Sequence, residues 1–291
     1  MIIGAHVSTQ GGLATAFDRA EADGCDCFQI FTKNKGAWAA RPLVEDEVNA
    51  FRERARSSRA APVIAHAAYL LNIASPGSDV RTRSVEALRI EVERCEALGI
   101  PHLVLHPGCH MGSGEDAGLA CAAESMDEVH AATRGFETKV LIETSAGQGS
   151  SICTTLESIG GLLARVREPD RLGVCLDTCH LFAAGYDLRT REGYAEAMET
   201  LDREVGIERV LCIHVNDSKR ELGSRVDRHE HIGRGKLGLE AFRSFLADPL
   251  LARVPFVIEL PPEDGMIRKN LAALRRLARR QARPAGKTPG S

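Results

Sequence analysis

The chain has 291 residues, of which 44% are hydrophobic, and it carries 37 lysines and arginines against 40 aspartates and glutamates. This composition is typical of a soluble globular protein with a large core, and no apolar run approaches the roughly 18 residues that a membrane-spanning helix needs. The nine cysteines are scattered without a CxxC pair, which argues against a disulfide framework and against a zinc ribbon. Because strand character begins at the first residues and leaves no room for a signal peptide, we expect a cytoplasmic protein without a membrane partner.

Eight short apolar runs with strand character recur along the chain. They span Ile2–Val7, Cys27–Lys33, Pro62–Tyr69, His102–Pro107, Lys139–Thr144, Leu172–Asp177, Arg209–Asn216 and Val254–Leu260. Stretches of helical character lie between most of them and after the last, at Gly12–Ala22, Val44–Arg59, Asp79–Leu98, Asp116–Thr133, Thr155–Arg167, Arg191–Val205, Leu239–Leu246 and Met266–Gln281. A strand–helix repeat of about 36 residues predicts an α/β protein built as one (β/α)8 TIM barrel.

A doubly wound open sheet is the alternative architecture, but no glycine-rich dinucleotide-binding fingerprint follows the first strand. No linker or low-complexity segment divides the chain, so we predict one barrel domain over residues 1–281. Residues 282–291 are basic and rich in proline and glycine, which predicts a frayed cationic tail.

Ionisable residues mark the carboxyl ends of the last six predicted strands. They are His66, His106, Glu143, Asp177 with His180, His214 with Asp217, and Glu259, and a polar loop after the seventh strand adds Asp227, His229 and His231. In a TIM barrel the carboxyl ends of all strands meet at the face that carries the chemistry. Imidazole and carboxylate groups are ligands for zinc and related divalent cations. There are too many of them for one tetrahedral site, so the pattern predicts two or three metal ions.

Seven longer stretches carry a resemblance to a known family. They are IGAHVS at Ile3–Ser8, FTKN at Phe31–Asn34, LVLHPG at Leu103–Gly108, IETSAGQGSS at Ile142–Ser151, LDTCHLFAAGYD at Leu176–Asp187, HVNDSK at His214–Lys219 and GSRVDRHEHIGRG at Gly223–Gly235. Together they resemble the endonuclease IV family, the zinc-dependent apurinic/apyrimidinic (AP) endonucleases with a TIM-barrel fold. The stretches span nearly the whole chain.

The resemblance implies nine ligands for three Zn²⁺ ions, with Mn²⁺ or Fe²⁺ as alternatives in some sites. It assigns His66 and His106 to the first ion, with Glu143 bridging to the second. It assigns Asp177, His214 and Glu259 to the second ion, and His180, Asp227 and His229 to the third. His231 and Asp217 are left outside this set.

The activity that the resemblance implies is hydrolysis of the phosphodiester bond 5′ to an abasic site, which leaves a 3′-hydroxyl and a 5′-deoxyribose phosphate. Removal of 3′ blocking groups is a second expected activity, and the protein is expected to act as a monomer. The metals would acidify the attacking water and neutralise the phosphate. We expect Glu143 and Glu259 to be catalytic, with Glu259 orienting the water or accepting its proton.

Family members bend abasic DNA and fill the gap with side chains, and Tyr69 and Leu70 match two of these wedge positions. Relatives often have an arginine where this chain has Gly36, with Lys35 beside it and Trp38 nearby. The expected phosphate contacts are Lys33, Lys35, Lys219, Arg225, Arg228 and Arg234.

Two rival functions remain open on the sequence. A sugar isomerase of the xylose-isomerase-like group would use only Glu143, Asp177, His214 and Glu259, and would leave the other five ligands without a task. A catalytically silent DNA-binding protein is the other rival. The number of metal ions per chain and a nicking assay discriminate among the three.

Overall fold

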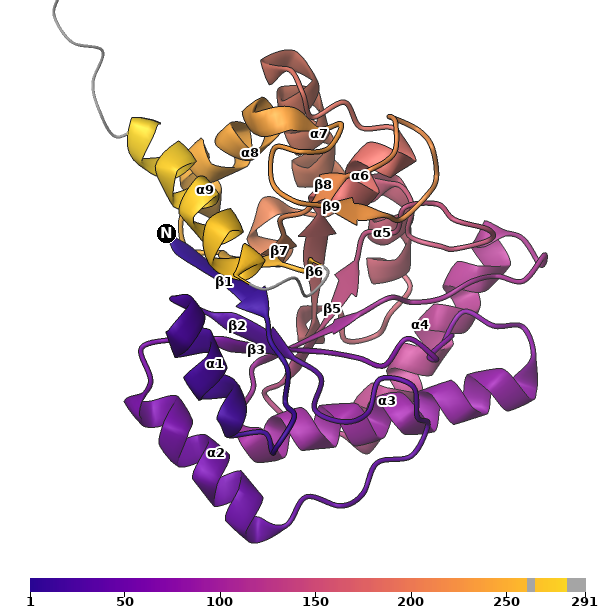
Figure 1. Ribbon diagram of the computed structural model, residues 1–291. Helices are drawn as coiled ribbons and strands as arrows, with labels where there is room; N and C mark the ends of the chain where they lie inside the picture. The colour runs from indigo at the N-terminus through magenta and orange to yellow at the C-terminus, as the bar shows by residue number, and fades with distance from the viewer. Residues whose placement is uncertain (261–264, 282–291) are drawn as a thin grey trace, which may run out of the picture.

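The computed structural model describes residues 1–260 and 265–281, and in them eight parallel strands close into a barrel (Figure 1). Around the barrel the strands follow one another in the order β1-β10-β7-β6-β5-β4-β3-β2. Their bounds are β1 Ile2–His6, β2 Phe28–Ile30, β3 Val63–His66, β4 His102–Leu105, β5 Lys139–Glu143, β6 Leu172–Asp177, β7 Val210–His214 and β10 Pro255–Ile258. The predicted TIM barrel is therefore confirmed, and the open doubly wound sheet is excluded.

Helices connect the strands and form the outer layer (Figure 1). They are α1 Thr15–Asp23, α2 Glu45–Ser57, α3 Ser78–Leu98, α4 Glu115–Ala132, α5 Leu156–Leu163, α6 Thr178–Ala184, α7 Arg191–Glu204, α8 Gly238–Ala247 and α9 Met266–Gln281, with 3-10 turns at Pro169–Arg171, Ile207–Arg209 and Pro249–Leu251. None of the helices in the described ranges is long and apolar enough to cross a membrane. The predicted tail, 282–291, lies outside the described residues, and the division of the chain at residue 281 stays a prediction.

Two local elements were not predicted from the sequence. The helix α6 begins directly after β6, because the Asp177 carboxylate accepts the backbone N–H of His180 at 2.9 Å and so caps the helix. A short antiparallel pair, β8 (Asp217–Ser218) and β9 (His229–Glu230), folds the loop after β7 back over the barrel mouth. Each of them positions residues of the predicted site.

The barrel interior is filled by one layer of small and apolar side chains, with a layer of polar side chains above it. The lower layer consists of Cys27, Ile64, Val104, Leu141, Cys175, Cys212 and Val257, all fully buried. Since side chains alternate along a strand, the residue two positions later faces the same way. That spacing places Gln29, His66, His106, Glu143, Asp177, His214 and Glu259 in the layer above. The predicted ligands of six strands therefore share one layer because of the strand period of two.

A β-bulge between β6 and β7 shifts the register of the two strands, so that the inward-facing residues of both strands lie opposite one another. Val174 pairs with Val210, but Cys175 pairs with Cys212, so one residue of β7 is passed over. That residue, Leu211, packs against the backbone of Gly173. Such a bulge puts two successive residues against one partner and re-aims those that follow. As a result Asp177 and His214 lie side by side.

The loop that follows β7 is held by Asp217, which is fully buried. Its carboxylate accepts four backbone N–H groups at 2.8 to 3.0 Å, those of Ser218, Gly233, Gly235 and Leu237. These bonds tie both ends of the segment that contains Asp227 and His229. Asp217 thus stabilises the loop, which explains why a carboxylate at this strand end takes no place in the predicted ligand set.

We expect Asp217→Ala to lower the free energy of unfolding by about 3 kcal/mol, because it leaves several buried N–H groups without an acceptor. Chemical denaturation monitored by circular dichroism measures the change. Asp116→Ala is the matched control, since the Asp116 side chain is exposed and, among the described residues, pairs only with Arg165, and its expected cost is below about 1 kcal/mol. Equal stability of the two variants would contradict the role given to Asp217.

Candidate metal centre

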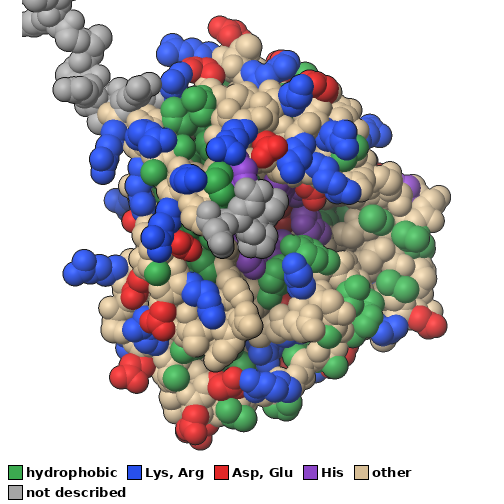
Figure 2. Space-filling model, viewed as in Figure 1, with side chains coloured by type: hydrophobic (Ala, Val, Ile, Leu, Met, Phe, Trp, Pro, Cys, Tyr) green, Lys and Arg blue, Asp and Glu red, His purple; other side chains and the backbone are tan. Residues whose placement is uncertain are grey.

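The nine predicted ligands come together at the carboxyl end of the barrel in three groups. Each group has its potential ligand atoms within 4.8 Å of one another. The groups are His66, His106 and Glu143; Glu143, Asp177, His214 and Glu259; and His180, Asp227 and His229. They are the same groups that the family resemblance implied. Figure 2 shows histidine side chains gathered in a hollow on this face of the molecule, with lysine and arginine side chains nearby.

Glu143 joins the first group to the second. It is fully buried at the end of β5, and its Oε2 lies 3.2 Å from Nε2 of both His66 and His106. Its Oε1 lies 2.9 Å from Nδ1 of His214 and 3.4 Å from Nδ1 of His180. One carboxylate with an oxygen turned to each side is the arrangement that a residue bridging two cations requires.

The second group surrounds His214 at the end of β7. The His214 Nδ1 lies 3.2 Å from Oε2 of Glu259 and 3.9 Å from Oδ2 of Asp177. Glu259 follows β10, the strand next to β7, and Asp177 ends β6 on the other side. With Glu143 at the end of β5, four adjacent strands therefore supply this group.

The third group depends on the two elements that the sequence did not predict. His180 lies in the first turn of α6, and His229 begins β9. The Asp227 Oδ1 lies 3.3 Å from Nε2 of each of these histidines. Both Nε2 atoms are buried and have no hydrogen-bond partner among the described residues. Two ring nitrogens that converge with a carboxylate oxygen in this way fit a bound cation.

Four of the histidines have one ring nitrogen held by an oxygen acceptor while the other faces the site. The acceptors are the carbonyl oxygens of Ala67 for His66, Thr144 for His180, Glu259 for His229, and the side-chain oxygen of Gln29 for His214, at 2.7 to 2.9 Å. Because a carbonyl oxygen can only accept, the bonded nitrogen carries the hydrogen, and the other presents a lone pair when the ring is neutral. Metal-binding histidines are oriented in this way.

Three carboxylates of the site, those of Glu143, Glu259 and Asp227, are ionised at neutral pH. Burial disfavours their charge, but neighbouring imidazoles outweigh it and hold the pKa of Glu143 well below its usual range. For the same reason the pKa values of Glu259 and Asp227 are lowered to about 2. These carboxylates lie about 3 Å from ring nitrogens, so their charge is stabilised by positive charge in the site, which divalent cations would also supply. The donor set therefore fits divalent metal ions.

The comparison with known sequences decides the family. Residues 17–277 match the family model described as xylose isomerase-like TIM barrel. The chain is 47% identical over 276 residues to the probable endonuclease 4 of Chloroflexus aurantiacus, covering 94% of this chain and 97% of that protein. The chain belongs to the endonuclease IV family. Its class is that of a nuclease of DNA repair.

Solved structures agree with this membership in the endonuclease IV family. The crystal structure of endonuclease IV from Thermus thermophilus superposes with a TM-score of 0.86 at 36% identity, covering 96% of this chain and all of that one. A D-tagatose 3-epimerase-like protein superposes with a TM-score of 0.73 at 20% identity, covering 97% of this chain and 100% of that one. The second similarity is one of fold alone.

Three polar residues that support this endonuclease IV site were not singled out from the sequence. Gln29 donates from its amide nitrogen to Glu259 Oε1 at 2.5 Å and accepts from His214. Asn216 donates to Asp177 Oδ2 at 2.7 Å and accepts the Glu259 N–H at 2.8 Å. Thr144 accepts the N–H of Asp177 at 2.8 Å. Gln29 and Thr144 occupy strand-end positions, and that position is the signal that could have found them.

Two further histidines, His6 and His231, belong to none of the three groups. His6 ends β1, and its Nδ1 lies 3.2 Å from the Gln29 amide and 4.0 Å from Glu259 Oε1, which places it beside the second group. Burial lowers the pKa of His6 to about 4. His231 lies outside the three groups, and its Nδ1 lies 3.1 Å from Nδ2 of Asn270 in α9.

The residues expected to form a DNA wedge lie at the rim of the site. Tyr69 and Leu70 are 57% and 37% exposed. The Tyr69 ring packs edge-on against Phe31 and His66, with ring centroids 5.4 and 5.7 Å apart. The Lys35 ammonium lies 5.3 Å from the centre of the Tyr69 ring. Trp38, in contrast, is half-buried and stacks against Arg83.

The basic residues expected to contact phosphates divide into two kinds. The exposed ones are Lys35, Lys219, Arg225, Arg228 and Arg234. Lys33 differs, because its side chain is only 3% exposed and its ammonium lies 3.4 Å from Glu91 of α3 and 2.5 Å from the carbonyl of Ala37. Lys33 is therefore paired within the protein rather than exposed, and its expected phosphate contact stays a prediction.

Proposed function

We propose that this protein hydrolyses the phosphodiester bond 5′ to abasic sites in double-stranded DNA, leaving 3′-hydroxyl and 5′-deoxyribose phosphate ends. The observation that carries the proposal is the nine-residue cluster at the barrel mouth, in three groups linked by Glu143. Removal of 3′ blocking groups is part of the proposal, since it breaks the same kind of bond beside a damaged sugar. The protein acts as a monomer in this proposal.

The proposed cofactors are three Zn²⁺ ions, with Mn²⁺ or Fe²⁺ as alternatives. His66, His106 and Glu143 hold one; Glu143, Asp177, His214 and Glu259 hold another; and His180, Asp227 and His229 hold the third. When bound, zinc neutralises phosphate charge and lowers the pKa of water. The unpartnered Nε2 atoms of His180 and His229 support such occupancy.

Glu259 lies where a residue that acts on the attacking water is needed. Its side chain reaches the site between Gln29 and His214, and its pKa is lowered to about 2, so it is ionised at neutral pH. Gln29 and the Asn216 side chain hold its side chain and its backbone. Glu259 therefore orients the attacking water and accepts its proton. Glu143 would bridge the ions of the first two groups and so set the distance between them.

Residues at the rim of the site recognise the lesion in this proposal. An abasic nucleotide has already lost its stacking and costs little to extrude from the duplex. Tyr69 and Leu70 then fill the gap in the DNA, and Lys35 and Arg228 contact its phosphates. Lys35, lying over the Tyr69 ring, supplies positive charge beside the position where many relatives have an arginine and this chain has Gly36.

A sugar isomerase is the main competing function, because Glu143, Asp177, His214 and Glu259 alone would suffice for it. The five further donors argue against that reading, since a single-metal isomerase has no task for them. A catalytically silent DNA-binding protein needs none of the nine groups.

Incision of a duplex oligonucleotide with one tetrahydrofuran abasic analogue tests the proposal. We expect cleavage on the 5′ side of the lesion, lost after prolonged chelation, in a preparation with about three metal ions per chain. Absence of cleavage together with one bound metal would favour the sugar isomerases. Binding to the lesion without cleavage by the fully metal-loaded protein would favour the silent binder.

We expect Tyr69→Ala to weaken binding of abasic duplex by about 1–3 kcal/mol, the usual worth of one aromatic stacking contact with nucleic acid. Fluorescence anisotropy with a labelled duplex measures this. Leu250→Ala is the control, because Leu250 is similarly exposed but lies near the amino end of β10, at the opposite end of the barrel. Unchanged affinity of the Tyr69 variant would remove Tyr69 from the proposed wedge.

A further inference from the structure

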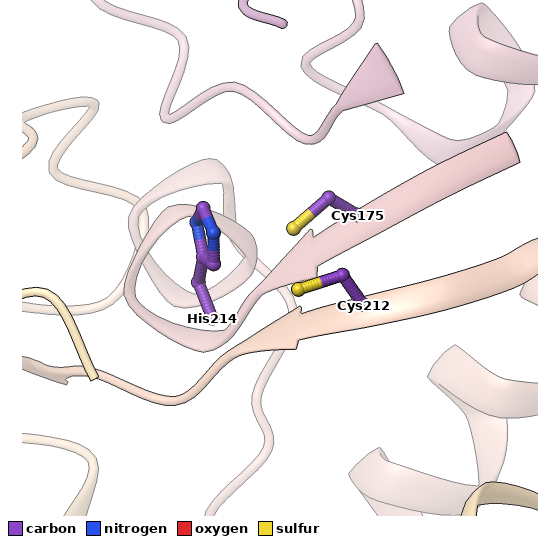
Figure 3. Close-up of side chains that lie close together, drawn as sticks. All are labelled: Cys175, Cys212 and His214. Carbon is purple, nitrogen blue, oxygen red and sulfur yellow. The ribbon is translucent and has the colours of Figure 1, made fainter. Parts of the chain in front are cut away.

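Two cysteines lie directly beneath the second ligand group. Cys175 of β6 and Cys212 of β7 are paired across the adjacent strands, and both are fully buried in the barrel interior. Each precedes a proposed ligand by two residues, so each faces the same interior as Asp177 or His214. Figure 3 shows the two sulfur atoms turned toward the His214 ring. The three donor atoms lie within 4.8 Å of one another.

We propose that Cys175, Cys212 and His214 form a second metal site, which takes soft d10 cations such as Cd²⁺ and Hg²⁺. A metal–sulfur bond is about 2.3 Å long for zinc, so one cation can bridge two sulfur atoms that lie within 4.8 Å of each other. Thiolate sulfur selects soft cations, whereas the carboxylates above select harder ones. Both thiol protons leave to solvent when the cation binds.

The side chains around the two cysteines favour a weakly hydrated cation over a strongly hydrated one. The other members of the layer are Cys27, Ile64, Val104, Leu141 and Val257. These side chains offer no charged or strongly hydrated ligand, so a hard cation would lose its hydration without compensation. A soft cation instead gains covalent character from sulfur.

Occupancy of this site changes the contacts of His214. One ring nitrogen lies 2.8 Å from Gln29, and the other faces Glu143 and Glu259 at 2.9 and 3.2 Å. Whichever nitrogen the soft cation takes, it replaces one of these contacts. The cation thus competes with the proposed zinc centre for His214. Binding does not depend on the proposed function, whereas the resulting inhibition rests on it.

Titration of the reduced, metal-free full-length protein with CdCl₂ tests the binding. We expect a tight thiolate-to-cadmium charge-transfer band at one equivalent, lost in Cys175→Ala and in Cys212→Ala. Cys95→Ala is the matched control, because Cys95 is equally buried but lies in α3, away from the barrel interior. Cadmium NMR of the wild-type protein reports sulfur ligation independently of whether the variants fold.

Persistence of the tight band in both variants, or a wild-type cadmium resonance in the range of oxygen and nitrogen ligation, would overturn the proposal. So would loss of the band in Cys179→Ala alone, since Cys179 forms a different group with Asp177 and His229. No DNA is present in these measurements, so they stand apart from any failure of the proposed nuclease activity.

A second arm measures the consequence. In the zinc-loaded protein, we expect CdCl₂ to suppress incision of the abasic duplex in the wild type and in Cys95→Ala. The ratio of rates with and without cadmium should stay near one in Cys175→Ala and Cys212→Ala. Equal suppression in all four proteins would overturn the competition for His214.

Discussion

Glu259→Gln is expected to slow incision at an abasic site by about a thousandfold or more, in the range that a positioned general base contributes. The substitution keeps the size of the side chain and removes its charge and its capacity to accept a proton. The backbone carbonyl of Glu259, which orients His229, is unaffected. Affinity for abasic duplex should be retained or increased, because a negative charge next to the phosphate is lost. Single-turnover incision and anisotropy measure the two effects separately.

Glu230→Gln is the matched control for this experiment. Glu230 lies in β9, next to His229, and its carboxylate accepts the N–H of His231. It belongs to none of the three groups, and its variant should retain most of the activity. Retained turnover in Glu259→Gln would rule out the role proposed for Glu259, whatever the affinity for DNA.

Glu143→Gln should reduce the metal content from about three ions per chain to about one. The first two groups share this carboxylate, so both lose a ligand, while His180, Asp227 and His229 keep their own set. An amide is a weaker ligand than a carboxylate and cannot balance the charge of two cations. Elemental analysis of purified protein after removal of loosely bound metal measures the change, and incision should fall below detection.

Glu124→Gln provides the comparison, because the Glu124 side chain is exposed and pairs only with Arg81 within the part of the chain that the structure describes. Its metal content should equal that of the wild type. If Glu143→Gln retained its full complement of metal, Glu143 would not bridge two ions. If it lost all metal, the third group would depend on the other two.

The sequence by itself determined the barrel and most of the site. Strand-like and helical stretches alternate regularly, and a parallel sheet built from them closes with all carboxyl ends on one face. A polar residue two positions after an inward-facing apolar residue also faces the barrel interior, one layer higher, as His66 lies above Ile64. This is local geometry, and it needs no knowledge of distant contacts.

Tertiary structure decided what depends on residues far apart in the chain. The sequence predicted Lys33 to be a surface cation, but it pairs in the interior with Glu91, which lies 58 positions later in the chain. Asp217 was a strand-end candidate that the family resemblance left outside the ligand set, and the structure shows why, because the loop after β9 uses its oxygens. The bulge that aligns Cys212 with Cys175 is likewise invisible in either strand alone. Burial and pairing are properties of two segments brought together, so no pattern within one of them could specify these outcomes.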